Sequence, residues 1–134
     1  MKKEYFCKNC KKKLLGRNKS YCNNRCQGDY QYKQYIIRWK QGLETGLRGR
    51  YALSNHVCRY LREKYDNKCH KCGWSKINQF TNTVPLEVEH IDGNYLNNVE
   101  NNLDLLCPNC HSLTSTYKGA NKGNGRKERY KYYL

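Results

Sequence analysis

Cys69-His70-Lys71-Cys72 and Cys107-Pro108-Asn109-Cys110 are two CxxC knuckles separated by 34 residues, and together they predict a structural zinc site. A spacing of two residues lets both sulfurs of a knuckle bind one tetrahedral zinc ion, while nearby backbone amides soften the thiolate charge. Because 34 residues exceeds the insert of a common zinc ribbon, we expect a functional unit between the knuckles. Redox-active or chance CxxC pairs are the alternative.

Four more cysteines predict a second structural zinc site of the treble-clef or ribbon kind; they are Cys7, Cys10, Cys22 and Cys26. Their spacing is less diagnostic than that of the first set. The ninth cysteine, Cys58, lies outside any pair and is expected to be a small buried apolar residue. An odd total, arranged in tight pairs, favours zinc sites over the disulfide framework of a secreted protein.

The composition predicts a small, zinc-stapled α+β protein rather than one with a large hydrophobic core. Among 134 residues there are thirteen Tyr but only two Phe, two Trp and one Met, so metal staples are expected to supply stability. The N-terminus lacks the apolar stretch of a secretory signal, and no segment approaches the roughly 18 apolar residues of a membrane span. We therefore expect a cytoplasmic protein with no membrane partner.

The charge is strongly positive and unevenly distributed. Lys and Arg number 26 against 11 acidic residues, and the formal net charge of +15 favours a polyanionic partner over a merely soluble basic surface. Residues 77–117 contain no Lys or Arg but carry five carboxylates, which are Glu87, Glu89, Asp92, Glu100 and Asp104. Such an acidic island repels phosphate unless a cation occupies it. The pattern predicts a divalent-metal centre within a protein that grips DNA.

A first helix is predicted to begin at the cap Asp29 and to end at Gly42. Its apolar side chains recur at positions i, i+3, i+4 and i+7; they are Tyr32, Tyr35, Ile36 and Trp39. We expect most of this stripe to pack against the N-terminal zinc knuckles rather than to stack on nucleobases.

A second helix is predicted to follow the cap Ser54 and to run to about Tyr65, with Val57 and Leu61 on its apolar stripe. Alternating apolar and charged residues over 84–91 are followed by the turn signal Asp92-Gly93-Asn94. This combination predicts a short β-hairpin closed by that turn.

The insert between the CxxC knuckles carries a recognisable order of residues. Leu86-Glu87-Val88-Glu89-His90-Ile91-Asp92-Gly93-Asn94 is followed by Glu100-Asn101-Asn102-Leu103-Asp104-Leu105-Leu106 and then by Cys107-Pro108-Asn109-Cys110-His111. Over residues 54–118 the chain resembles the HNH endonuclease family, whose signature is an acidic residue and a His on a hairpin, an Asn-Leu before the second knuckle, and a CxxCH ending. It is similar to the free-standing HNH enzymes of phages and bacteria, some of which are homing endonucleases.

The resemblance implies a β-hairpin followed by a helix that clasps one metal ion, and a role for each motif residue. His90 would be the general base that activates water, and Asn102 would hold the loop and help to orient that base. Glu89 and His111 would bind the catalytic divalent metal. The chemistry agrees, because attack on a phosphodiester needs a base with a pKa near neutrality and a hard cation at the phosphate.

Strand alternation would aim Glu89 and His90 at opposite faces, so a shared site requires a twist or a bulge at the end of the hairpin. Glu87 and Asp92 are the alternative metal-binding carboxylates. The other two histidines, His56 and His70, are expected to be structural.

These patterns divide the chain into four parts. Residues 1–42 form a zinc-knuckle module with a helix, 43–53 a basic Gly-rich linker, 54–118 the HNH nuclease domain, and 119–134 a basic tail that is mobile until it meets a polyanion. Basic residues outside the acidic island are expected to contact phosphate; they are Lys11, Lys12, Lys13, Arg48, Arg50, Lys118, Lys122 and Arg126.

The expected function is a magnesium- or manganese-dependent endonuclease that nicks or cleaves DNA as a monomer or homodimer. A non-catalytic zinc module that binds nucleic acid is the first alternative, and a protein-interaction adaptor is the second, which the net charge disfavours. A nucleobase deaminase is excluded, because Asp92 stands where that class needs a Glu two residues after the His, and Pro108 lies inside the knuckle.

Overall fold

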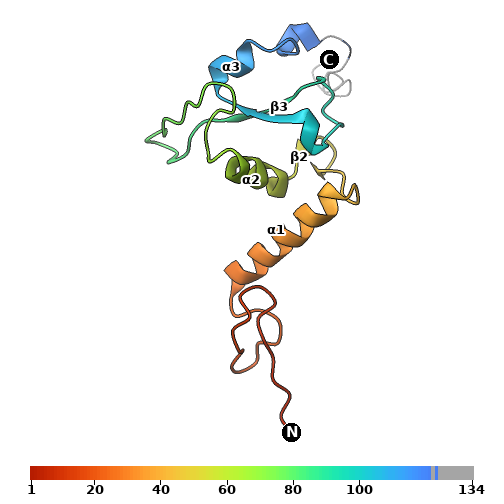
Figure 1. The fold of residues 1–134 in the computed structure, drawn as a ribbon, viewed down its shortest axis with the longest axis vertical. Coiled ribbons are helices and arrows are strands. Elements are labelled where there is room, and N and C mark those ends of the chain that lie inside the picture. The colour runs from red at the N-terminus through yellow and green to blue at the C-terminus, as the bar shows by residue number, and fades with distance from the viewer. Residues whose placement is uncertain (122, 124–134) are drawn as a thin grey trace, which may run out of the picture.

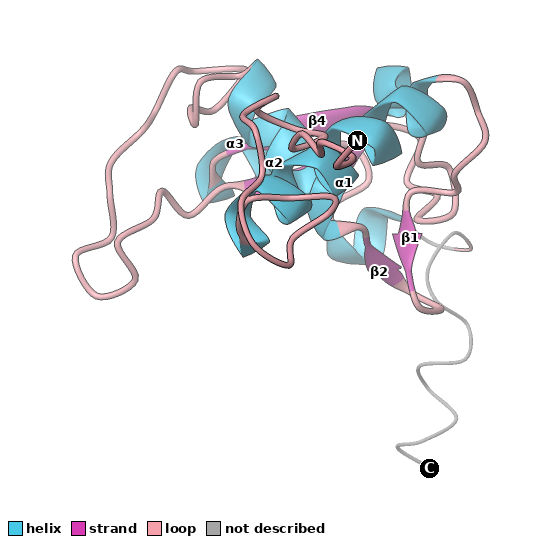
Figure 2. Ribbon diagram, turned by 90° about the horizontal axis from the view of Figure 1, so that it is seen from below, coloured by secondary structure: helices cyan, strands magenta, loops and turns pink. Residues whose placement is uncertain are grey.

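The computed structural model describes residues 1–121 and 123 and is elongated, with a cysteine-rich module at one end and a sheet flanked by helices at the other (Figure 1). The elements are α1 (Asn24–Lys40), β1 (Leu47–Arg48), β2 (Ala52–Leu53), α2 (Asn55–Lys64), β3 (Glu87–His90), η1 (Glu100–Asn102), β4 (Leu103–Leu106), α3 (Pro108–Ser112) and η2 (Lys118–Asn121). The strands form two separate antiparallel pairs among helices and loops (Figure 2). The predicted α+β class is confirmed.

Helix α1 begins earlier than the sequence pattern predicted. The side chain of Asn23 accepts a hydrogen bond from the backbone N–H of Cys26, so Asn23 is the N-cap and the predicted cap Asp29 was wrong. The helix ends at Lys40, close to the predicted Gly42, which adopts a φ of 77° just beyond it. The cysteine-rich module therefore runs directly into a 17-residue helix.

The apolar stripe of α1 packs on the second helix and not on the zinc knuckles. A single buried cluster joins α1, α2 and β4; its members are Tyr32, Ile36, Trp39, Val57, Leu61 and Leu103. The expectation that the stripe packs against the N-terminal cysteines was wrong, because the packing partner lies in a later helix and periodicity does not reveal it. As a result, α1 is anchored to the part of the chain that carries the acidic island.

Helix α2 confirms its prediction. The hydroxyl of Ser54 accepts a hydrogen bond from the N–H of His56 at 3.2 Å and caps the helix, which ends at Lys64. Val57 and Leu61 are fully buried. The segment before it, which we expected to be a linker, contains the β1–β2 hairpin, with Leu47 opposite Leu53.

Strands β3 and β4 pair antiparallel, with Glu87 opposite Leu106 and His90 opposite Leu103. The sheet lies between α2 and α3 (Figure 1). The twelve residues 91–102 connect the two strands, so the Asp92-Gly93-Asn94 turn lies inside a longer loop and does not close a tight hairpin as predicted. In the described part of the chain, no helix is long and apolar enough to cross a membrane.

Candidate metal centre and active site

Two groups of four cysteines each bring their sulfurs together. The N-terminal group is Cys7, Cys10, Cys22 and Cys26, and the central group is Cys69, Cys72, Cys107 and Cys110; within each, all sulfurs lie within 4.8 Å of one another. The sulfurs of Cys10 and Cys22 are 3.7 Å apart, and those of Cys72 and Cys107 are also 3.7 Å apart. A tetrahedral zinc with Zn–S bonds of about 2.3 Å requires sulfur separations of about 3.8 Å, whereas a disulfide requires about 2.05 Å. Both groups could therefore hold a zinc ion.

The backbone around each CxxC knuckle favours thiolate. Burial alone would raise the pKa of the Cys69 thiol, but backbone N–H groups of Cys107, Cys72 and Lys71 donate to the sulfur and lower its pKa to about 6. The pKa of Cys7 falls to about 6 in the same way. Hydrogen bonds from the other sulfurs of the same group raise the pKa of Cys22 and of Cys110, so one thiolate forms first in each group, and metal binding would release the remaining protons.

The central cysteine group fixes the start of α3. The sulfur of Cys107 accepts a hydrogen bond from the N–H of Cys110 at 3.4 Å, which makes Cys107 the N-cap, and Pro108 occupies the first turn. His111 is the next residue after Cys110 on this helix. A zinc ion in the central group would hold α3 and thereby set the position of the His111 ring.

His111 and Glu89 meet between α3 and the sheet. The Nε2 atom of His111 lies 2.7 Å from Oε2 of Glu89, whose side chain is only 8% exposed. The other carboxylate oxygen of Glu89 accepts a hydrogen bond from the hydroxyl of Thr116. The structure thus brings together the two residues that we expected to bind the catalytic metal.

A second carboxylate holds the opposite side of the same ring. Oε2 of Glu87 lies 2.6 Å from Nδ1 of His111, and the Glu87 side chain is 52% exposed. Glu87 and Glu89 are two residues apart on β3 and so share the face of the sheet that lies toward α3. A carboxylate on Nδ1 keeps a proton there, which leaves Nε2 as the nitrogen that can bind a metal.

The donor set fits a divalent cation. A buried carboxylate oxygen and an imidazole nitrogen, each about 2.1 Å from a metal and at right angles, would be about 3.0 Å apart. The observed 2.7 Å between Glu89 and His111 requires only a few tenths of an ångström of opening. Two protein ligands would leave the remaining positions of the ion for water and phosphate.

The other carboxylates of the acidic island contact partners other than His111, although Asp104 lies directly opposite Glu89 on β4. Glu100 lies 3.7 Å from the ammonium of Lys40 and 3.6 Å from that of Lys64. Asp104 contacts Nδ1 of His70 at 2.7 Å. The island is therefore not one site, and Glu87 and Glu89 are the members that face His111.

His90 lies on the other face of β3 from Glu89. The backbone pairing is unbroken from Glu87 through His90, and Ile91 continues the ladder with a 2.9 Å bond to the carbonyl of Asn102, so strand alternation holds and the sheet has no bulge here. Nε2 of His90 lies 2.6 Å from Oδ1 of Asn98. The expected twist or bulge that would turn both side chains to one face is absent from these pairs.

Asn102 closes the loop between β3 and β4. Its amide nitrogen donates to Oδ1 of Asp92 at 2.9 Å and to the carbonyl of Asn97 at 2.8 Å, and its amide oxygen accepts from the N–H of Asp92 at 3.0 Å. Hydrogen bonds, first from the Asn97 side chain and then from Asn94 and Asn102, lower the pKa of Asp92. Asp92 thus acts in the loop and not beside His111.

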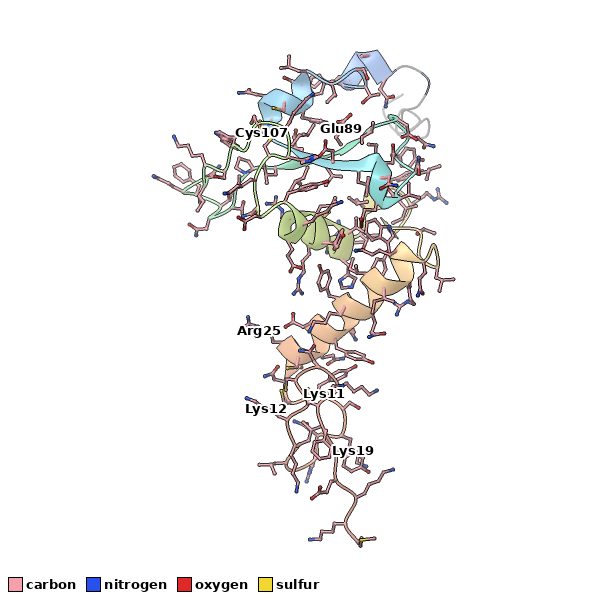
Figure 3. All side chains as sticks on the ribbon, viewed as in Figure 1. Lys11, Lys12, Lys19, Arg25, Glu89 and Cys107 are labelled. Atoms are coloured by element: carbon pink, nitrogen blue, oxygen red, sulfur yellow. The ribbon has the colours of Figure 1, made fainter. Side chains whose placement is uncertain are left out.

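The N-terminal cysteine module carries much of the positive surface. Figure 3 shows Lys11, Lys12, Lys19 and Arg25 at the opposite end of the molecule from Glu89. Lys11 donates to a backbone carbonyl at 3.0 Å, and Lys13 forms an ion pair with Glu4.

The other predicted phosphate-binding residues are scattered. Arg48 lies on β1 and donates to Asn55 at 3.1 Å, and Arg50 lies in the turn that follows. Lys118 begins η2, with its ammonium 5.1 Å from the ring centroid of Tyr117. Lys122 and Arg126 lie outside the described residues, as does most of the predicted tail.

Sequence comparison adds one relative. The H-N-H endonuclease F-TflIV of Escherichia phage T5 is 41% identical to the chain over 96 residues. The matched region covers 68% of this chain, which spans about 40% of the relative's length. No family model matches the chain, and no solved structure matches it significantly.

Proposed function

The chain belongs to the HNH endonuclease family, and from this premise we propose that it is a metal-dependent endonuclease that hydrolyses phosphodiester bonds of DNA. The observation that carries the proposal is the Glu89–His111 pair, in which a nearly buried carboxylate faces an imidazole at 2.7 Å in a protein of net charge +15. A protein that only binds DNA gains nothing from a buried acid at this place, because a carboxylate repels phosphate.

Each motif residue has a task in this proposal. Glu89 and His111 hold a magnesium or manganese ion, which when bound supplies positive charge at the scissile phosphate and the leaving oxygen. Glu87 keeps the proton on Nδ1 of His111, and so presents Nε2 to the ion. His90 removes a proton from the attacking water, because a neutral imidazole is basic near pH 7.

The arrangement of β3 constrains how DNA lies in the site. Glu89 and His90 are adjacent, so their Cα atoms are about 3.8 Å apart, yet their side chains leave opposite faces. The scissile phosphate therefore has to lie across the end of β3, where it can reach both. Asn102 holds the loop at this end and keeps the strand end in place.

The cysteine module is proposed to extend the grip on DNA. Its exposed lysines and arginine lie far from Glu89, at the N-terminal end of α1 (Figure 3). Contacts from these residues to phosphate add affinity without sequence readout. A homing role would use this extended footprint. One site per chain predicts nicking by a monomer, and a double-strand break would require a second chain.

The experiment that tests the proposal compares the native chain with His90→Ala on supercoiled plasmid. Both proteins are loaded with zinc, and cleavage is followed with magnesium, with manganese and with chelator. We expect metal-dependent conversion to open-circle or linear DNA by the native chain, and a loss on the order of 100-fold or more in His90→Ala with DNA affinity unchanged. His56→Ala is the matched control, because His56 lies on α2 and its ring contacts that of Tyr35, with centroids 4.9 Å apart.

The alternative function is a zinc module that binds nucleic acid without cutting it. Tight, salt-sensitive binding by both proteins, with no cleavage of duplex or single-stranded substrates under any metal, would favour this alternative and overturn the nuclease.

A further inference from the structure

His90 is held by a residue that the HNH signature does not include. The Asn98 side chain lies in the loop between β3 and β4, is 4% exposed, and places Oδ1 at 2.6 Å from Nε2 of His90. The amide of Asn102 is already used by Asp92 and by the carbonyl of Asn97. Asn102 therefore shapes the loop, while the direct contact to the proposed base comes from Asn98.

The contact defines which nitrogen of His90 carries the proton. An amide oxygen only accepts, so a neutral His90 must donate from Nε2, and the lone pair is then on Nδ1. The orientation of the amide is supported by its other end, where Nδ2 donates to the carbonyl of Thr45 at 3.4 Å. Because that carbonyl can only accept, an exchange of the amide oxygen and nitrogen would cost the hydrogen bond to Thr45.

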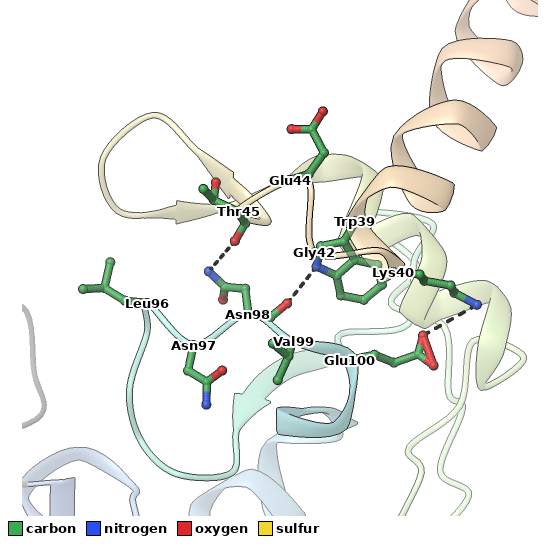
Figure 4. A pocket seen from close by; sticks show the side chains of 10 residues that line it. All are labelled: Trp39, Lys40, Gly42, Glu44, Thr45, Leu96, Asn97, Asn98, Val99 and Glu100. Carbon is green, nitrogen blue, oxygen red and sulfur yellow. Dashed lines mark hydrogen bonds and ion pairs between the residues drawn. The ribbon is translucent and has the colours of Figure 1, made fainter.

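Asn98 is itself fixed by the segment that follows α1 (Figure 4). The indole Nε1 of Trp39 donates to the backbone carbonyl of Asn98 at 2.7 Å. Gly46 has a φ of 75°, and a Cβ built there would lie 2.8 Å from the Cβ of Asn98. The segment from the end of α1 to the start of β1 thus contacts Asn98 at its backbone, its amide and its Cβ.

We propose that Asn98 is a positioning residue for His90, which holds the imidazole through Nε2 and so sets the orientation of the ring at the end of β3. The inference rests on the proposed role of His90 as the base. It also assigns a task to α1, because Trp39 and the turn after it keep Asn98 in place.

The test compares two substitutions of similar size in the zinc-loaded full chain. Asn98→Leu removes the acceptor, whereas Asn98→Asp keeps an acceptor oxygen at the same position. Plasmid cleavage gives kcat and KM, and proton NMR reports whether the Nε2–H of His90 is protected from exchange. Zinc content and thermal unfolding are measured for both variants. If Asn98→Leu loses zinc, it is replaced by Asn98→Ser, whose hydroxyl is too short to reach His90.

We expect Asn98→Leu to lower kcat on the order of 10- to 100-fold with KM for DNA unchanged and to lose the Nε2–H signal, since misplacement of a base by about 1 Å costs this much. Asn98→Asp should keep the signal and lose less of kcat than Asn98→Leu does, although it also gives up the Nδ2 donor to the Thr45 carbonyl. Equal losses of kcat in both variants with the signal retained, or an unchanged kcat in Asn98→Leu, would overturn the inference. If the native chain does not cut DNA, the proposed function fails, and the Nε2–H signal still decides whether Asn98 holds His90.

Discussion

Glu87 is predicted to control how tightly the catalytic metal binds without taking part in the reaction. The substitution Glu87→Gln replaces a charged acceptor on Nδ1 of His111 with a neutral amide, which accepts a weaker hydrogen bond. The proton on Nδ1 is then held less firmly, so Nε2 becomes a poorer metal ligand.

The size of this effect follows from the geometry. Loss of such a partner of a metal-binding His lowers metal affinity about 10- to 100-fold. The contact is short, at 2.6 Å, but the Glu87 side chain is 52% exposed, so water can replace part of it. We therefore expect the lower end of the range, about 10-fold, which is about 1.4 kcal/mol of binding free energy.

The assay is the initial rate of plasmid cleavage as a function of magnesium concentration. Glu87→Gln should raise the half-saturating magnesium concentration about 10-fold and leave the rate at saturation nearly unchanged, whereas Glu89→Gln should abolish saturation because it removes a proposed ligand. Glu4→Gln is the control, since Glu4 pairs with Lys13 in the cysteine module. An unchanged half-saturating magnesium concentration in Glu87→Gln, or a loss of the saturating rate as complete as that of Glu89→Gln, would contradict this role of Glu87.

Three further predictions concern DNA binding, zinc and stability. Lys12→Gln should reduce the slope of log affinity against log salt by about 0.9, and Lys13→Gln by less, because Glu4 already pairs with Lys13; fluorescence anisotropy at several salt concentrations checks this. Cys72→Ser should lower the zinc content from two ions per chain to one, measured with a colorimetric chelator, and an unchanged content would contradict the central site. Hydrogen bonds, first from Arg59 and then from Tyr32, lower the pKa of Glu63 below 4.5. The ionised Glu63 therefore stabilises the fold above that pH, and this contribution is lost as the pH falls through the lowered pKa. Glu63→Gln should accordingly reduce the free energy of unfolding by about 0.2–1 kcal/mol at neutral pH, as expected for an exposed pair, and by less in acid; denaturant titrations at pH 7 and pH 3 measure the difference.

Local signals in the sequence predicted the elements that depend on neighbouring residues. Ser54 and the stripe of Val57 and Leu61 define α2, because a cap and a helical repeat act within one turn or two. The start of α1 was missed, since Asn23 caps a turn that carries the cysteine ligand Cys26 and has few apolar residues to mark it as helical.

Contacts between residues that are distant in the sequence could not be predicted from sequence patterns. Asp92-Gly93-Asn94 is a strong turn signal, yet the strand that pairs with β3 begins only at Leu103, and strand pairing depends on tertiary contacts. Motif order identified Glu89 and His111, which the structure places together. It could not single out Asn98, because the chain has asparagines at 97, 98, 101 and 102 and only the folded loop shows which of them reaches His90.

The proposed nuclease activity is tested most directly by whether the zinc-loaded 134-residue chain alone cuts supercoiled plasmid when magnesium or manganese is supplied. Open-circle or linear product should appear with the added metal, stop forming when the metal is chelated, and form again when the metal is restored. Tight DNA binding without any cleavage, or cleavage of equal rate with and without the divalent metal, would contradict the proposed metal-dependent activity.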